Sequence, residues 1–133
     1  MPGSFFDTNV LLYVVSGDDR KADRAAELIG QGGTISIQNL NEYANAARRK
    51  LGLPWERLHL HLKALRETLD VVPVTLSIHE RGLQIAQRYR LSTYGAMIVA
   101  SALEADCETL WSEDMHHDLH IDDLTIRNPF ASP

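Results

Sequence analysis

The sequence predicts an α/β protein with a central, mostly parallel sheet of four to five strands and helices on both faces. Two observations predict this fold class. Short apolar segments alternate along the chain with longer segments whose apolar residues recur every three or four positions, and this alternation is typical of parallel sheets. The length of 133 residues suits one domain with a sizeable core. We therefore expect a single domain over residues 1–133.

The first half of the chain is expected to form two strands and four helices. Ser4 to Phe6 is short and aromatic, as a covered strand would be, and 34–37 alternates polar with β-branched residues. One expected helix begins at Val10. The other three cover residues 20–29, 38–51 and 55–69. The last helix carries an apolar stripe, which favours packing against the core over packing against a partner protein: Trp55, Leu58, Leu62, Leu65 and Leu69.

The second half is expected to form three strands and two helices. The strands cover 71–74, 109–111 and 124–126, and the helices cover 77–89 and 96–104. The helix from Ala96 is apolar on nearly all sides, as expected of a helix buried in the centre of a domain. Because this run is far shorter than the roughly 20 residues that cross a bilayer, we expect no transmembrane helix.

Net charge, cysteine content and the N-terminal sequence indicate the class of protein and its compartment. The formal net charge of -5 argues against a protein that coats nucleic acid through general basicity. The single cysteine, Cys107, cannot form an internal disulfide, which agrees with a reducing compartment, and we expect it in the core. The N-terminus lacks the pattern of a secretory signal. We therefore expect a cytoplasmic protein.

Three acidic residues each follow an expected strand directly: Asp7, Glu42 and Asp114. A parallel sheet would bring them to one edge, where ligands collect in such folds. Carboxylates gathered without basic partners repel one another, and a hard cation such as Mg²⁺ or Mn²⁺ is the usual remedy. Such an ion suits phosphoryl chemistry. The alternatives are an N-cap for Asp7, a first-turn acid that favours the helix dipole for Glu42, and a plain acidic loop around Asp114.

Six segments of the chain carry motifs whose order and spacing are specific, although no single one is decisive. They are residues 6–11 (FDTNVL), 38–42 (QNLNE), 91–94 (LSTY), 96–102 (AMIVASA), 110–115 (LWSEDM) and 126–130 (IRNPF). Together these segments resemble the PIN domain family and, within it, the VapC-type toxins of type II toxin-antitoxin systems. The resemblance spans essentially the whole chain and implies a PIN-like three-layer sandwich.

The resemblance implies a metal-dependent endoribonuclease that cleaves RNA with a Mg²⁺-activated water, forms homodimers and is silenced by a cognate antitoxin. By position, Asp7, Glu42 and Asp114 match three of the family's acidic residues. Ser112 matches a small hydroxyl position that orients the acids, and Asp118 is a weaker candidate for an accessory acid. The cofactor implied is Mg²⁺ or Mn²⁺.

The family pattern breaks at Gly95, where an acidic residue is expected. Glycine has no ligand to offer, and it also removes the capping box that Ser92 would form with an acid three residues later. Either this is a natural variant with weakened metal binding, or an aspartate was deliberately replaced so that a toxic nuclease can be produced. We favour an engineered or selected loss. The same glycine supports an alternative function, a PIN-fold binding module that holds an antitoxin or RNA without cleavage.

Basic residues that could bind RNA phosphates fall into two groups, each of which has an ordinary charged helix face as its alternative. The first group is Arg48, Arg49 and Lys50, and the second is Arg81, Arg88 and Arg90. The histidines His116, His117 and His120 lack the companions that frame a zinc site, so a solvated loop is the favoured interpretation.

Overall fold

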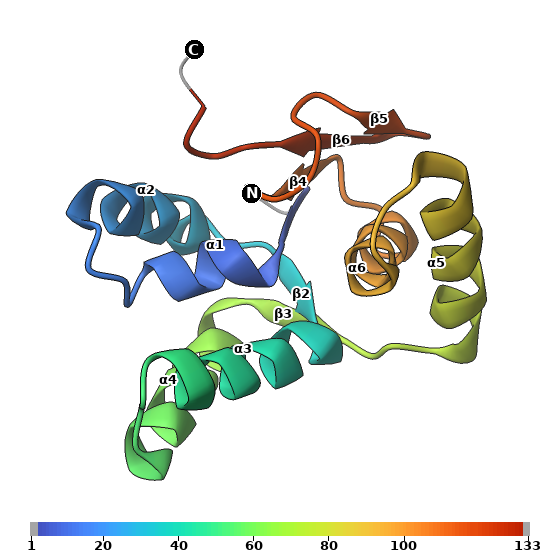
Figure 1. Cartoon of the computed structure of the whole chain (residues 1–133). Helices are drawn as coiled ribbons and strands as arrows, with labels where there is room; N and C mark the ends of the chain where they lie inside the picture. Colours follow the sequence, from blue (N-terminus) through green and yellow to red (C-terminus); the bar gives the residue numbers. More distant parts are fainter. Residues whose placement is uncertain (1–2, 132–133) are drawn as a thin grey trace.

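The computed structural model describes residues 3–131, in which strands and helices alternate as predicted (Figure 1). Several helix starts are set by capping side chains. Ser92, for example, accepts a hydrogen bond from the Gly95 amide at 3.0 Å, so that helix begins at Thr93 and not at Ala96. The elements are β1 (Ser4–Phe6), α1 (Thr8–Tyr13), α2 (Asp19–Gly30), β2 (Thr34–Ser36), α3 (Ile37–Lys50), α4 (Trp55–Thr68), β3 (Asp70–Val72), α5 (Leu76–Tyr89), α6 (Thr93–Glu104), β4 (Thr109–Trp111), β5 (His120–Ile121) and β6 (Leu124–Arg127).

Within the described residues, six strands form one sheet in the order β3-β2-β1-β4-β6-β5. The central strand β1 runs parallel to β2 and β4, with Phe5 opposite both Thr34 and Leu110. β5 is antiparallel to β6. The sheet of the described residues has six strands, one more than the upper number predicted. The additional strand is β5, which has only two residues, too few to show a sequence pattern. It forms through a tight turn at Asp122, whose φ of 52° lies in the left-handed region that Asp tolerates.

Helices cover both faces of the sheet, which confirms the three-layer arrangement (Figure 1). Helices α5 and α6 pack on one face with Phe5 and Leu110, and helices α1 to α4 pack on the other with Phe6 and Ile35. Phe5 and Phe6 enter different clusters because successive side chains of a strand point to opposite faces. Both phenylalanines are fully buried.

Helix α6 lies in the core, as its sequence predicts, with every residue from Ala96 to Ala102 buried. Its close approach to α5 depends on Gly82. A Cβ atom at that position would lie 2.5 Å from the Sδ of Met97, whose side chain is buried and would have to shift. Gly82 therefore leaves room for the Met97 side chain between the two helices.

The apolar stripe of α4 packs largely as expected. Leu58 and Leu69 are buried in the core, and Leu62 and Leu65 pack partly against it. Trp55 is the exception: it is 59% exposed and lies under the guanidinium of Arg48, 4.3 Å from the ring centroid. It falls outside the core because it is the first residue of the helix and projects beyond the packed surface.

Two further expectations can be compared with the structure. Cys107 is buried, which confirms the prediction of a core thiol. None of the helices in residues 3–131 combines the length and apolar character that a membrane span needs.

Candidate active site

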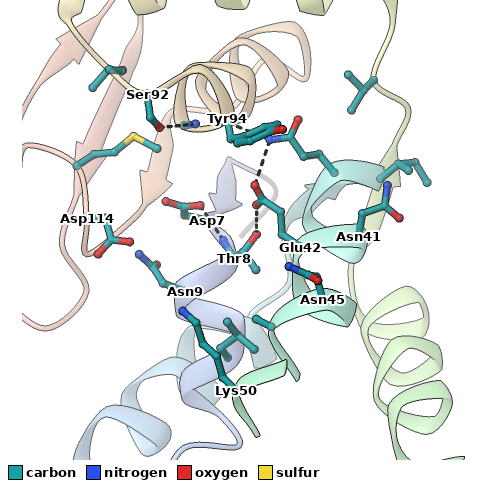
Figure 2. Close-up of a pocket in the computed structure, with 18 of the residues that line it drawn as sticks. Asp7, Thr8, Asn9, Asn41, Glu42, Asn45, Lys50, Ser92, Tyr94 and Asp114 are labelled. Carbon is teal, nitrogen blue, oxygen red and sulfur yellow. Dashed lines mark hydrogen bonds between the residues drawn. The ribbon is translucent and has the colours of Figure 1, made fainter. Parts of the chain in front are cut away.

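The three predicted acids line one cavity at the carboxyl edge of the sheet. Asp7 follows β1, Glu42 lies on α3, and Asp114 follows β4. Together with Ser92 and Gly95 they line a cavity of about 1020 Å³ (Figure 2). The parallel topology brings them together because β1, β2 and β4 are adjacent and end at the same edge. Residues separated by more than a hundred positions thus face one space.

Asp7 is fixed on both oxygens. As the N-cap of α1 it accepts a hydrogen bond from the Thr8 amide at 2.8 Å, and its other oxygen accepts one from the hydroxyl of Ser112, also at 2.8 Å. Ser112 itself is fully buried. The capping alternative is therefore correct, but capping and membership of the cavity are compatible roles for one carboxylate.

Burial raises the pKa of Asp7 from 3.8 to about 6. The hydrogen bonds from Ser112 and Thr8 work in the opposite direction, while the negative charges of Glu42 and Asp114 raise the pKa further. The ionised form of Asp7 is therefore costly in the protein as it stands. A positive charge placed in this cavity would relieve that cost.

Glu42 is held by a network that starts at a buried asparagine. The hydroxyl of Thr8 donates to Glu42 at 2.6 Å, and the Asn39 amide donates to Thr8 at 3.1 Å and to the Phe6 carbonyl at 2.9 Å. Asn39 is fully buried and also accepts from the Ser36 amide at 2.8 Å. This chain of hydrogen bonds ties the end of β1 to α3 and fixes the orientation of the Glu42 carboxylate.

The structure corrects the expected position of Glu42 within its helix. Because β2 ends at Ser36 and α3 begins at Ile37, no acid lies in the first turn and Glu42 falls in the second. At that distance from the helix start, the dipole explanation for Glu42 loses its basis. The hydrogen bonds and the cavity account for the residue instead.

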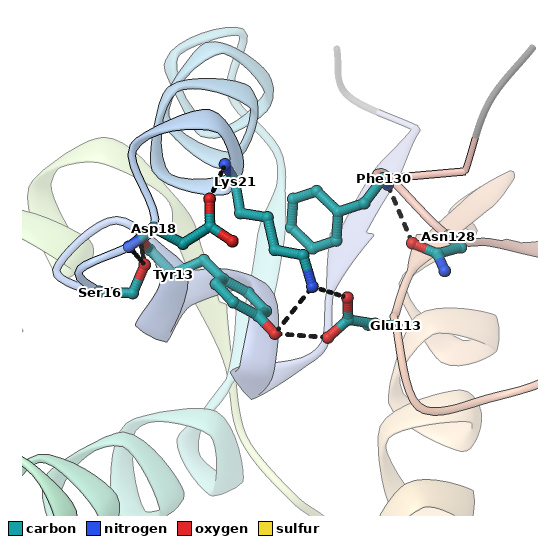
Figure 3. A network of polar contacts seen from close by, with 7 residues as sticks. All are labelled: Tyr13, Ser16, Asp18, Lys21, Glu113, Asn128 and Phe130. Carbon is teal, nitrogen blue, oxygen red and sulfur yellow. Dashed lines mark hydrogen bonds and ion pairs between the residues drawn. The ribbon is translucent and has the colours of Figure 1, made fainter.

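The loop that carries Asp114 is anchored by the neighbouring residue, Glu113, whose contacts are shown in Figure 3. Lys21 and the Tyr13 hydroxyl both donate to Glu113, at 2.5 and 2.6 Å. Desolvation works to raise the pKa of Glu113, but these hydrogen bonds hold it below its usual value. The Tyr13 ring packs edge-on against Phe130, 4.9 Å between centroids. The loop after β4 is thereby joined to α1 and α2, while Asp114 is left exposed on the cavity side.

The donor set suits a hard divalent cation in charge and chemical type. In residues 3–131 no Lys, Arg or His forms an ion pair with Asp7, Glu42 or Asp114, and carboxylate oxygens are preferred ligands of Mg²⁺. Both polar atoms of the Asn9 side chain, beside the same cavity, are buried without a hydrogen-bond partner. In this part of the chain, however, no three acidic, His or Cys side chains lie close enough together to hold an ion.

Gly95 adds no ligating side chain to the acidic residues of this cavity. It lines the cavity in the first turn of α6, and an added Cβ would meet the Ser92 hydroxyl at 2.9 Å and the end of Met115 at 3.4 Å. Both neighbours are ends of side chains, but the Ser92 hydroxyl also caps α6 by accepting from the Gly95 amide, so moving it would weaken that cap. A side chain at this position would extend along the cavity wall, toward the loop that carries Asp114.

The remaining predicted residues do not all reach the cavity. Lys50 lines it, whereas Arg48 stacks on Trp55 and Arg49 is simply exposed. Asp118 does not line it and instead lies on the turn before β5, 3.4 Å from His117.

The second basic group is dispersed, and so are the histidines. Arg90 lines the cavity, but Arg81 pairs with Glu104 and Asp122 on another surface. Among the histidines, His116 lines the cavity, while His117 and His120 bond elsewhere.

Several residues that line or support the cavity were not predicted as site residues from the sequence. Asn39 could have been found, because Ser36 followed three residues later by a polar side chain resembles a capping box. Thr8 and Asn9 lie in the motif around Asp7, but the pattern does not show which side chain turns inward. Tyr94, which is 69% exposed at the cavity, lies in the matching segment 91–94, but that segment does not assign a role to its side chain.

The fold and the acidic cavity define the class of protein. Residues 4–119 match the PIN domain family, and the chain belongs to that family, whose nucleases generally use divalent metals. No curated protein sequence matches closely enough to indicate a relative.

Among solved structures, the fold is that of VapC toxins and their complexes. A toxin-antitoxin complex from Klebsiella pneumoniae matches with 25% identity and a TM-score of 0.74, over 96% of this chain and 98% of the other. VapC20 of Mycobacterium tuberculosis, a toxin that cleaves the sarcin-ricin loop, matches with 18% identity and a TM-score of 0.69, over 84% and 89%. DNA-bound VapBC from Salmonella typhimurium matches with 18% identity and a TM-score of 0.71, over 97% and 99%.

Proposed function

We propose that this chain is the toxin of a toxin-antitoxin pair, a metal-dependent endoribonuclease impaired by the glycine at position 95. One observation carries the proposal: Asp7, Glu42 and Asp114 line a single cavity without basic partners among residues 3–131, and Gly95 lines the same cavity. The PIN family match and the VapC folds of the structural neighbours support the nuclease class.

The side chains of the chain would divide the work. Asp7, Glu42 and Asp114 would hold Mg²⁺ or Mn²⁺, and a bound ion of this kind activates a water and offsets charge on the phosphate. Thr8 and Ser112 fix the orientation of the two inner carboxylates through their hydroxyls. These hydrogen bonds fix two of the carboxylates, but among residues 3–131 the three acids would have to move closer together to hold one cation.

The second candidate is a PIN-fold module that binds an antitoxin or RNA without cutting. Gly95 favours it, and so does the lack, in the described part of the chain, of three ligating side chains close enough to hold an ion. Both functions need the same cavity. They differ in whether a divalent cation is retained and whether the phosphodiester is broken.

The experiment compares this chain with the Gly95→Asp variant for cleavage of a mixed RNA substrate, with Mg²⁺, with Mn²⁺ and with chelator. Cleavage by the aspartate form alone, and only with metal, would support a disabled nuclease. Equal cleavage by both would show that position 95 is dispensable and that three acids suffice. If neither form cuts RNA, the binding module becomes the preferred function.

The antitoxin partner is proposed from the neighbouring complexes, which pair a toxin with an antitoxin. The homodimer, the RNA substrate, the cytoplasmic location and the single nuclease domain over residues 1–133 remain predictions. Co-expression with a candidate antitoxin, followed by size-exclusion chromatography with light scattering, would test both the antitoxin complex and the homodimer.

A further inference from the structure

The cavity has a second wall that the acidic residues do not explain. Along α3, Gln38, Asn41 and Asn45 line it at spacings of three and four residues, so they share one helix face. The side chains of Asn41 and Asn45 are exposed and make no hydrogen bond within residues 3–131. Each amide carries two donors and an acceptor. This wall therefore offers unused, uncharged hydrogen-bonding groups beside Glu42.

An aromatic side chain stands next to this amide wall. Tyr94 is 69% exposed at the edge of the cavity, and its carbonyl accepts a hydrogen bond from Gln38 at 3.0 Å. Figure 2 shows Tyr94 on the α6 side above Glu42, with Asn41 and Asn45 on the α3 side. Gln38 also reaches Glu42, at 3.4 Å. The ring, the amides and the acidic centre thus form one continuous surface.

The charge of the cavity indicates how a polyanion would bind there. Among residues 3–131, the Lys and Arg side chains that line the cavity are Lys50 and Arg90. The acidic residues of the same cavity repel phosphate. With two phosphate contacts, the affinity for a single strand would fall with salt at a logarithmic slope of about -1.4. Most of the affinity would then come from bases. Aromatic stacking and amide contacts to base edges supply it only when the base is unpaired.

We propose that Tyr94, Asn41 and Asn45 form a subsite for an unpaired RNA base next to the acidic centre, with Tyr94 stacking on the base and the two amides contacting its edge. This inference rests on the proposed function, because it takes RNA as the substrate. It adds that the substrate is single-stranded at the site and that the α3 amides determine base preference. Gln38 joins the backbone carbonyl of Tyr94 to the Glu42 carboxylate.

The test is RNA binding, which does not require that the chain cuts. Fluorescence anisotropy would be measured with a labelled single strand of about 12 nucleotides, with the same strand in a duplex, and with four homopolymers. Tyr94→Ala should weaken single-strand binding about 5- to 150-fold, the effect of losing one stacked base, while Tyr94→Phe should bind within about twofold of the parent. Asn41→Ala and Asn45→Ala should reduce the differences among homopolymers.

Controls separate stacking from folding. Leu60→Ala removes another exposed large side chain, 62% exposed and outside the cavity, and should leave binding unchanged. The melting temperature of each variant should match the parent, because Tyr94, Asn41 and Asn45 are exposed. The inference is wrong if Tyr94→Ala binds like the parent, if Tyr94→Phe is as weak as Tyr94→Ala, or if the parent binds no single strand at about 100 μM protein.

Cleavage by the Gly95→Asp variant distinguishes this inference from the proposed function. If that variant cleaves RNA and adding Tyr94→Ala changes neither rate nor binding, the subsite fails and the nuclease stands. If no cleavage occurs but Tyr94→Ala loses single-strand binding, the subsite stands and the nuclease fails.

Discussion

Replacing Asp7 by asparagine should make the metal-free protein more stable near neutral pH, although the same change would remove a proposed metal ligand. Burial raises the pKa of this carboxyl from 3.8 to about 6. That rise corresponds to about 3 kcal/mol of unfavourable free energy for the ionised form. Asparagine has nearly the same shape and no charge, so most of this cost should disappear.

The expected gain is smaller than the full cost. Asparagine offers one acceptor oxygen in place of two, so the hydrogen bonds from the Thr8 amide and the Ser112 hydroxyl cannot both persist unchanged. The Ser112 hydroxyl can rotate to accept from the new amide, at a cost of about 1 kcal/mol. We expect a net gain of about 1–2 kcal/mol, or about 3–8 °C in melting temperature for a chain of this size.

The dependence on pH identifies the cause. Because the folded protein raises the pKa of Asp7, it binds the proton more tightly than the unfolded chain does. The contribution of Asp7 is therefore fully favourable below about pH 4 and is lost as the pH rises through 6. The advantage of Asp7→Asn should be absent at pH 4 and reach its full size above pH 6.

Urea denaturation in the presence of chelator, at several pH values between 4 and 7.5, measures this difference. Asp123→Asn, an exposed carboxylate away from the cavity, is the matched control and should change stability by less than about 0.5 kcal/mol. Millimolar Mn²⁺ should stabilise the parent more than Asp7→Asn. An asparagine variant that is less stable at pH 7, or whose advantage is equal at all pH values, would show that the buried charge of Asp7 does not cost stability.

Three further changes test the fold and the site. Asn39→Ala should lower the free energy of unfolding by about 2–4 kcal/mol in urea denaturation, because it leaves buried partners on Phe6, Thr8 and Ser36 unsatisfied. Gly82→Ala should destabilise by about 1–3 kcal/mol in thermal melts, because the added carbon overlaps Met97. Glu113→Gln should change stability by less than about 1 kcal/mol, but it should speed amide hydrogen exchange in residues 112–116 by releasing the loop from Lys21.

Each of these predictions has a control and a contrary result. Asn41→Ala, exposed on the same helix, should be nearly neutral, and an Asn39→Ala variant of equal stability would contradict the network. Gly30→Ala is the control for Gly82→Ala, because the new carbon at position 30 has open space around it. If both variants had the same melting temperature, α5 and α6 would be able to separate without cost. Unchanged exchange in Glu113→Gln would mean that other contacts hold the Asp114 loop.

The order of most elements, and an arrangement with helices on both faces of the sheet, could be predicted from the sequence, whereas the face that each helix covers came from the structure. Apolar periodicity located every helix, and the continuous apolar run in α6 predicted its burial. The rule that parallel strands end at one edge was enough to bring Asp7, Glu42 and Asp114 to one cavity. These features could be predicted because they depend on local patterns. Each depends either on a run of neighbouring residues or on where a residue lies relative to its nearest strand.

Tertiary structure alone decided how the side chains meet. The Thr8–Glu42, Tyr13–Glu113 and Ser112–Asp7 hydrogen bonds join residues 34, 100 and 105 positions apart. It also separated Lys50 from its basic neighbours and placed Tyr94 beside the α3 amides. Local pattern carries no information about these pairings, because the direction of a polar side chain is set by which partner the packed core brings within about 3 Å of it.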